Sequence, residues 1–147
     1  MNDIERAGAF SFMPIAAFIT SAAHLMLALL EREVKSRGGT VAAWDTDSSA
    51  IVATKDGGWI DATADGGGTK RVRALSWLEV EEIVGAFETL NPYDRSIVRG
   101  SILKIEDINF DPSGTLREVW MYAVSSNHYC MFEIVDGEPR FIVDESG

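Results

Sequence analysis

Two aspartates, Asp45 and Asp47, stand two residues apart between two apolar runs typical of β-strands. The pattern of the stretch 40–54 predicts a hairpin that reverses at its acidic tip. In extended backbone, side chains two residues apart leave the same face of a strand, so both carboxylates would lie close together. Carboxylate oxygens suit Mg²⁺ or Mn²⁺, which also bind waters and substrate phosphates. The alternative is an acidic turn without a ligand, since Asp is an ordinary turn residue.

A long apolar helix is predicted before this hairpin, with Pro14 in its first turn. Residues 13–30 contain no Asp, Glu, Lys or Arg, which raises the possibility of a membrane span. Polar residues within the run and the charged continuation after it favour a helix of a soluble domain, buried on most sides and without a membrane partner. His24 lies in this helix, and a core histidine is favoured there over a metal ligand.

A second helix is predicted to begin at Ser76, because Ser76 and Glu79 have the spacing of a capping box. Asn91 and Pro92 end it. The apolar residues between them recur at helical spacing and form a stripe that faces the core. The stripe consists of Trp77, Val80, Ile83, Val84, Phe87 and Leu90.

The remaining segments are predicted as a loop and a meander. Glycine clusters predict a flexible loop insertion at about 55–75, in which the basic run 70–73 is a solvated edge rather than a phosphate contact. Turn signals at 111–114 and 136–137 separate expected antiparallel strands. The expected strands are 102–108, 116–124, 128–135 and 140–143. The fold class is therefore α+β, an antiparallel β-sheet with helices packed on one face.

Composition narrows the class of protein. A chain of 147 residues with 46% hydrophobic and 24% charged residues is expected to form a single globular domain over 1–147. The net charge of −10 argues against a stand-alone nucleic-acid binder, which would carry a basic face. Cys130 is the single cysteine, which excludes an intrachain disulfide and favours a cytoplasmic location.

The residues Trp44-Asp45-Thr46-Asp47-Ser48 resemble the Y-G-D-T-D-S motif of the palm domain of family B DNA polymerases. Residues 20–39 resemble the palm helix that leads into this motif, and Gly38 and Gly39 are expected to form the exit of this helix. The I-V-A-T ending of the second strand is similar to a bacterial branch of polymerase-like proteins. The resemblance implies a palm-like fold in a DNA-directed DNA polymerase, a nucleotidyltransferase of replication or repair. It implies that Asp47 bridges the metal ions, Mg²⁺ or Mn²⁺, and that Asp45 is its less essential neighbour. DNA and a nucleoside triphosphate would be the partners.

A second resemblance lies downstream, at 100–106 and 122–129. The latter segment is similar to the Lys-x-Tyr region of the family, whose basic residues hold the primer–template duplex. Tyr129 retains the tyrosine, whereas Asn127 stands in place of the lysine and His128 in place of its basic neighbour. These three residues are the candidate nucleic-acid contacts, and the two replacements predict weaker binding of DNA.

Two family motifs do not occur in the sequence: D-x-x-S-L-Y-P-S, with a further metal-binding aspartate, and K-x-x-x-N-S-x-Y-G, with the triphosphate-binding lysine. Two-metal phosphoryl transfer needs carboxylates from separate strands. The sequence is therefore expected to be a palm fragment of a longer chain, inactive alone and weak in metal binding, with the remainder of that chain as its partner.

Three alternatives remain for the acidic tip. Residues 41–49 resemble the D-x-D signature of haloacid dehalogenase phosphatases, with Asp45 as nucleophile and Asp47 as general acid. The spacing also fits an Asp-x-Asp site of a glycosyltransferase. A degenerate, non-catalytic palm scaffold is the third. An EF-hand loop from Asp45 is excluded, because Ala50 occupies the position that requires glycine.

Overall fold

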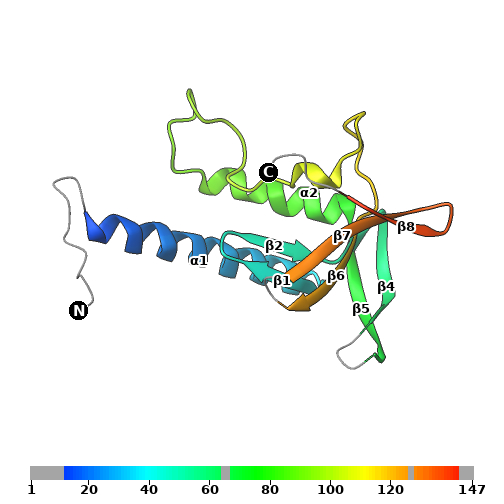
Figure 1. Ribbon diagram of the computed structural model, residues 1–147. Helices are drawn as coiled ribbons and strands as arrows, with labels where there is room; N and C mark the ends of the chain where they lie inside the picture. The colour runs from blue at the N-terminus through cyan, green and yellow to red at the C-terminus, as the bar shows by residue number, and fades with distance from the viewer. Residues whose placement is uncertain (1–11, 64–66, 126–127, 143–147) are drawn as a thin grey trace, which may run out of the picture.

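The computed structural model describes residues 12–63, 67–125 and 128–142, and it confirms the α+β class. The helices and strands are shown in Figure 1. In chain order they are α1 (Met13–Ser36), β1 (Val41–Asp45), β2 (Ser48–Ile51), β3 (Ala53–Thr54), β4 (Asp56–Thr63), β5 (Thr69–Ser76), α2 (Trp77–Ala86), the 3₁₀ turns η1 (Phe87–Leu90) and η2 (Asp107–Asn109), β6 (Trp120–Ser125), β7 (His128–Val135) and β8 (Glu138–Phe141).

The core lies where the second half of α1 meets β5 and α2. Its buried side chains come from these three elements and from η1, and they form one cluster: Leu30, Val34, Leu75, Ile83 and Phe87. The apolar stripe predicted for α2 is confirmed at its centre by Ile83 and Phe87, which are fully or almost fully buried. The predicted capping box at Ser76 is also present.

The end of α1 positions the following hairpin against this core. The N–H of Gly38 donates to the carbonyl of Lys35, and that of Gly39 to the carbonyl of Val34, both at 2.9 Å. Together with a φ of +74° at Gly38, this is a Schellman ending, which a residue with a Cβ adopts only with strain. The predicted helix exit at the two glycines is therefore confirmed.

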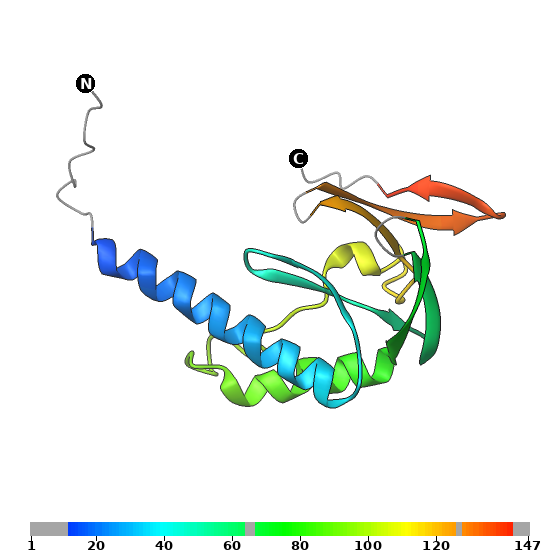
Figure 2. The same cartoon turned by 90° about the horizontal axis from the view of Figure 1, so that it is seen from below.

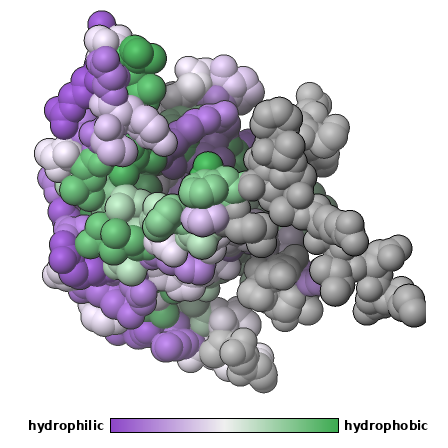
Figure 3. Space-filling view, turned by 90° about the vertical axis from the view of Figure 1, so that its left-hand side faces the viewer, coloured by the Kyte–Doolittle hydropathy of each residue, from purple (hydrophilic) through white to green (hydrophobic). Residues whose placement is uncertain are grey.

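The first half of α1 projects from the body of the protein, as Figure 1 shows. The prediction that this helix is buried on most sides is wrong, because Phe18 and Ile19 are 70% and 65% exposed and only 6% of the most apolar 18-residue window is buried. Figure 3 looks at this end of the molecule and shows apolar side chains gathered between polar ones. By length and composition alone, α1 could also cross a membrane. The core contacts of Leu30 and Val34 show that its second half belongs to the folded body.

The strands of the described segments form three sheets instead of the single antiparallel sheet that was expected. β1 pairs with β2, while β6, β7 and β8 form an antiparallel meander in that order. The middle sheet has the order β3-β5-β4, in which β3 and β5 run parallel. Figure 2 shows both helices along one side of the molecule and the β6–β7–β8 sheet on the opposite side.

The expected loop at 55–75 is instead the hairpin of β4 and β5, which pair from Asp56 with Ser76 to Thr63 with Thr69. The prediction failed because the glycines occupy the ends of this hairpin: Gly57 is the second residue of β4 and Gly67 lies just before β5, both with positive φ. Between the glycines, β-forming residues pair along both strands, and Leu75 anchors β5 in the core.

The expected strand at 102–108 is not formed. Ile102 and Leu103 pack against the core from irregular backbone, and the 3₁₀ turn η2 follows. The hydroxyl of Ser101 accepts the N–H of Leu103 at 3.0 Å, a local bond that replaces a strand partner. The expected strand at 116–124 begins only at Trp120, with an isolated bridge between Leu116 and Phe110 before it.

The last two strands confirm the predicted hairpin. β7 has the predicted bounds, and Asp136 and Gly137 reverse the chain with φ values of 53° and 84°. Two consecutive residues with positive φ match the right-handed twist of the strands that they join, which is why Asp-Gly predicts this turn so well. The turn at 111–114 is also confirmed, since the N–H of Gly114 donates to the carbonyl of Asp111 at 2.9 Å.

Candidate functional site

The acidic tip is the reversal of a two-stranded antiparallel hairpin, as predicted. Asp45 is the last residue of β1 and faces Ser48, the first residue of β2, while Thr46 and Asp47 form the turn between them. The expectation that both carboxylates leave one face of an extended strand is wrong, because the turn ends the extended backbone before Asp47. The two carboxylates are both exposed, at neighbouring positions of the same tip.

A shallow hollow of about 320 Å³ separates the tip from α1. The helix contributes His24, Leu27 and Glu31, which are spaced by three and four residues and therefore lie on one face. The hairpin contributes Trp44, Asp45 and Thr46. His24 is exposed at this hollow. The interpretation of His24 as a core histidine is therefore wrong.

Hydrogen bonds around the hollow are few and local. The hydroxyl of Thr46 donates to Oδ1 of Asp45 at 3.3 Å. Glu31 forms an ion pair with Lys35 one turn further along α1. On β2, the buried Oγ of Ser49, opposite Trp44, has no hydrogen-bond partner among the described residues. The tip thus presents carboxylate oxygens to solvent, and Glu31 on the helix side of the hollow is paired with Lys35.

These donors do not make a complete metal site. Among the residues that the structure describes, no group of three or more His, Cys, Asp or Glu side chains is arranged to hold a metal ion. Asp45 and Asp47 can supply oxygen ligands to one cation, and its further ligands would have to be waters or groups from elsewhere. The expected affinity for Mg²⁺ or Mn²⁺ is accordingly low.

Comparison with known proteins gives no match for this chain. No protein-family model matches it, and no curated protein or solved structure matches it significantly.

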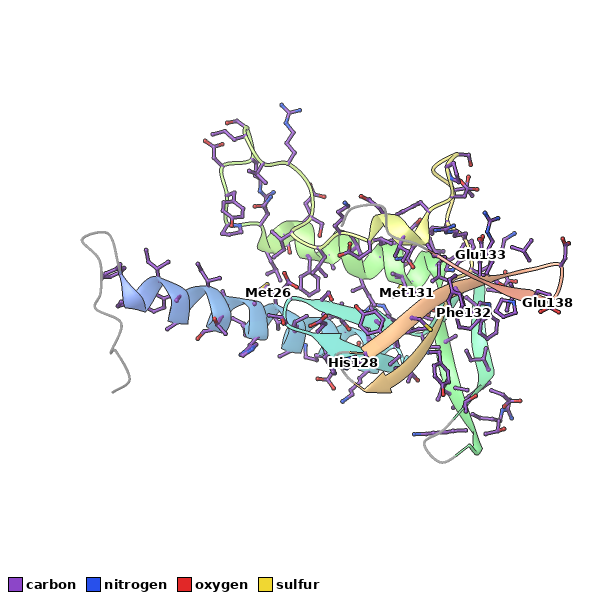
Figure 4. The ribbon with its side chains drawn as sticks, in the orientation of Figure 1. Met26, His128, Met131, Phe132, Glu133 and Glu138 are labelled. Atoms are coloured by element: carbon purple, nitrogen blue, oxygen red, sulfur yellow. The ribbon has the colours of Figure 1, made fainter. Side chains whose placement is uncertain are left out.

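Two of the three downstream candidates, His128 and Tyr129, lie on a different sheet from the tip. His128 begins β7, as Figure 4 shows, and Tyr129, which is 42% exposed, follows it and pairs with Ala123. Neither of them lines the hollow beside Asp45. Asn127 falls outside the described residues. The role of these three residues as nucleic-acid contacts stays a prediction.

Glu31 is the charged residue of the hollow that was not predicted from the sequence as part of a site. The spacing His24-Leu27-Glu31 was available as a signal, because residues separated by three and four positions share a helix face. The spacing does not tell toward which face of the helix the following hairpin folds. That direction is determined by the Schellman ending of α1 and by Val41 and Ile51, which pack against the core.

Proposed function

We propose that this chain is the palm-like part of a family B DNA polymerase-like protein, in which the acidic hairpin contributes to a site for nucleotidyl transfer. The proposal rests on the resemblance of Trp44–Ser48 to the polymerase motif. One observation supports it above all: Asp45 and Asp47 occupy the tip of an antiparallel hairpin that directly follows a long helix and a two-glycine exit. Asp47 would hold the metal ions and Asp45 would assist.

The available metal ligands limit this chain to one half of a two-metal site. Two-metal phosphoryl transfer clamps the attacking and leaving oxygens with carboxylates from separate strands. Here both carboxylates come from one hairpin, and the described residues offer no third ligand beside them. DNA and a nucleoside triphosphate would therefore bind productively only together with further polymerase motifs, and this chain alone should not incorporate nucleotides.

A non-catalytic palm scaffold is the second candidate, and the incomplete donor set favours it. The net charge of −10 points the same way, because it opposes contact with a phosphate backbone. The phosphatase alternative has less support. After Asp47 the chain turns directly into β2, which pairs back on β1, and no glycine-containing turn leads away from the strand.

Thermal unfolding in chelator and in Mn²⁺ separates the first two candidates. A metal that binds only the folded state stabilises it by about 1.4 kcal/mol at ten times Kd. Asp47→Asn should melt at or slightly above the wild type in chelator, because one of two neighbouring like charges is removed. In millimolar Mn²⁺ the wild type should gain stability and Asp47→Asn should not. Asp136→Asn is the matched control, since Asp136 is also an aspartate of a hairpin turn.

Two results would change the proposal. If the wild type and Asp47→Asn respond alike to Mn²⁺, the tip is an acidic turn and the scaffold is the better description. If primer extension with Mn²⁺ shows incorporation by the wild type that Asp47→Asn abolishes, the chain carries a complete site and the half-site description is wrong.

A further inference from the structure

The middle of the β4–β5 hairpin carries an exposed aromatic ring beside basic side chains. Trp59 is 64% exposed. It pairs with Arg73 across the hairpin, and Asp61 pairs with Arg71 two positions further along, so these four residues share one face of the sheet. Lys70, next to Arg71 in β5, is also exposed, on the opposite face of the sheet. None of these residues belongs to the acidic tip.

The two arginines of this face have different surroundings. The guanidinium of Arg73 lies 3.4 Å from the carboxylate of Glu79 and would lie about 3.1 Å from a Cβ at Gly38, so it is held against the helices. Arg71 has no ion pair within the described residues, and its Cζ lies 5.8 Å from the ring centroid of Trp59. The guanidinium of Arg71 is therefore positioned by a cation–π contact with Trp59 and is available to an external anion.

The chemistry of this pair identifies the class of ligand. A guanidinium binds phosphate oxygens, and an exposed indole ring offers its free face to a planar base. The run 70–73 carries three basic residues within a chain of net charge −10, so an anionic ligand suits this place best. A duplex hides the faces of its bases, whereas an unpaired base can stack. We propose that Trp59 and Arg71 form a contact site for single-stranded nucleic acid.

Asp61 determines how strong this contact can be. Its carboxylate is directly opposite Arg71 on the same face and lies where a phosphate would approach. Repulsion between that carboxylate and a phosphate weakens the site without removing the stacking surface. The site is therefore a weak one that Asp61→Asn should strengthen. It is independent of the acidic tip, because it needs neither Asp45 nor Asp47 nor a metal ion.

The probe is a fluorescein-labelled oligothymidylate of about 15 nucleotides, within the span of known single-strand sites. Fluorescence anisotropy measures its affinity for the wild type and five variants at several salt concentrations. Trp59→Ala should weaken binding by at least about fivefold, the lower range for loss of one stacked base. Arg71→Ala should reduce the slope of log K against log salt by about 0.7, one phosphate contact. Asp61→Asn should tighten binding.

Arg140→Ala is the matched control. Arg140 is an exposed strand arginine opposite a carboxylate, Glu133, just as Arg71 is opposite Asp61, but among the described residues it makes no cation–π contact with an aromatic ring. Its removal should alter binding far less than that of Arg71. Trp59→Phe should retain part of the affinity, which separates stacking from a general loss of structure.

Three outcomes would overturn the proposal. The first is unchanged affinity in Trp59→Ala. The second is an equal loss in Arg140→Ala and Arg71→Ala, which would mean attraction by net charge alone. The third is equal or tighter binding of a duplex of the same length or of polyglutamate, which would show a site for anions in general. Since no metal is added, a negative result leaves the Mn²⁺ experiment on Asp47 unaffected.

Discussion

Ser76 and Glu79 bind each other's backbone at the start of α2. The N–H of Ser76 donates to Oε2 of Glu79 at 2.7 Å, and the N–H of Glu79 donates to Oγ of Ser76 at 3.2 Å. Both donors would otherwise lack a partner at the end of the helix. Because α2 supplies Ile83 and, through η1, Phe87 to the core, this pair of bonds stabilises the element on which much of the core depends.

Ser76→Ala should lower the free energy of unfolding by about 1 kcal/mol, the usual loss for an N-cap oxygen. Ser76→Gly should cost less, since glycine is tolerated at the N-cap. Urea denaturation followed by circular dichroism measures both. Ser36→Ala is the control. The hydroxyl of Ser36 donates to the carbonyl of Glu33 at the C-terminal end of α1 and accepts no N–H at a helix start. An unchanged midpoint in Ser76→Ala would show that the cap contributes nothing.

Acid should weaken this cap. The hydrogen bonds from the backbone and hydroxyl of Ser76, and then the charge of Arg73, hold the pKa of Glu79 below its ordinary value of 4.5. A lowered pKa in the folded state means that the carboxylate stabilises the fold above about pH 4.5 and that this contribution is lost as the pH falls through the folded value.

Glu79→Gln keeps a hydrogen-bonding side chain and removes the charge. The difference in stability between wild type and Glu79→Gln should therefore be largest at pH 7 and shrink by about pH 3, measured from urea midpoints. Other carboxyls with lowered pKa contribute equally to both proteins and cancel in the difference; they are Glu33, Asp94 and Asp111. A difference that stays constant with pH would contradict a role for the charge.

Gly39→Ala should destabilise the fold although φ at this position is ordinary. A Cβ there would lie 2.7 Å from Cγ and Cδ2 of Leu75 and 3.0 Å from Cγ1 of Val34, all in the core. Overpacking of this kind costs about 1–3 kcal/mol. Gly85→Ala is the matched control, because a Cβ at Gly85, the last residue but one of α2, would meet no atom within 4 Å. It should gain about 0.5–1 kcal/mol.

Leu75→Ala alone should cost about 2–5 kcal/mol through the cavity that it leaves. The double variant Gly39→Ala/Leu75→Ala should be less destabilised than the sum of the single changes, because the alanine at 39 then has room. Urea unfolding of the four proteins in this cycle measures the coupling. Strict additivity would show that Gly39 and Leu75 are not in close contact.

The side chain of Asn91 ties down the segment that follows η1, and its replacement should lower the stability of the fold. Its Nδ2 donates to the carbonyls of Val98 and Gly100, both at 3.0 Å, and the side chain is buried, with 8% of the residue exposed. Asn91→Asp replaces the donor by an oxygen facing two carbonyls and should cost about 1–3 kcal/mol. Asn109→Ala, which removes a single exposed bond to the carbonyl of Glu106, should cost less. Equal losses of unfolding free energy in the two variants would show that the buried hydrogen bonds of Asn91 contribute no more than an exposed one.

Features that depend on a few neighbouring residues could be predicted from the sequence. The capping box at Ser76, the hairpin turn at Asp136 and Gly137, the two-glycine exit of α1 and the reversal at Asp45–Asp47 were all predicted and are present. In each case the turn or cap satisfies its own hydrogen bonds or φ requirement within a short stretch, so distant residues need not be known.

Strand formation at 55–75 and its failure at 102–108 depended on the tertiary structure. A strand needs a partner, and β5 has two, β3 and β4. The glycines around these strands are equally typical of a loop. Ile102 and Leu103 reach the core without a partner strand, so their apolar pattern was correct while the backbone geometry predicted from it was wrong.

The candidate site shows the same division. The two carboxylates and their place at a reversal follow from the sequence alone, because Asp, Thr and Ser between two β-forming runs favour a turn. That His24 and Glu31 face this tip was decided by the packing of Val41 and Ile51 on the core, together with the close approach of Gly39 to Leu75. These contacts join residues far apart in the sequence, and only their packing sets the angle at which the hairpin meets the helix.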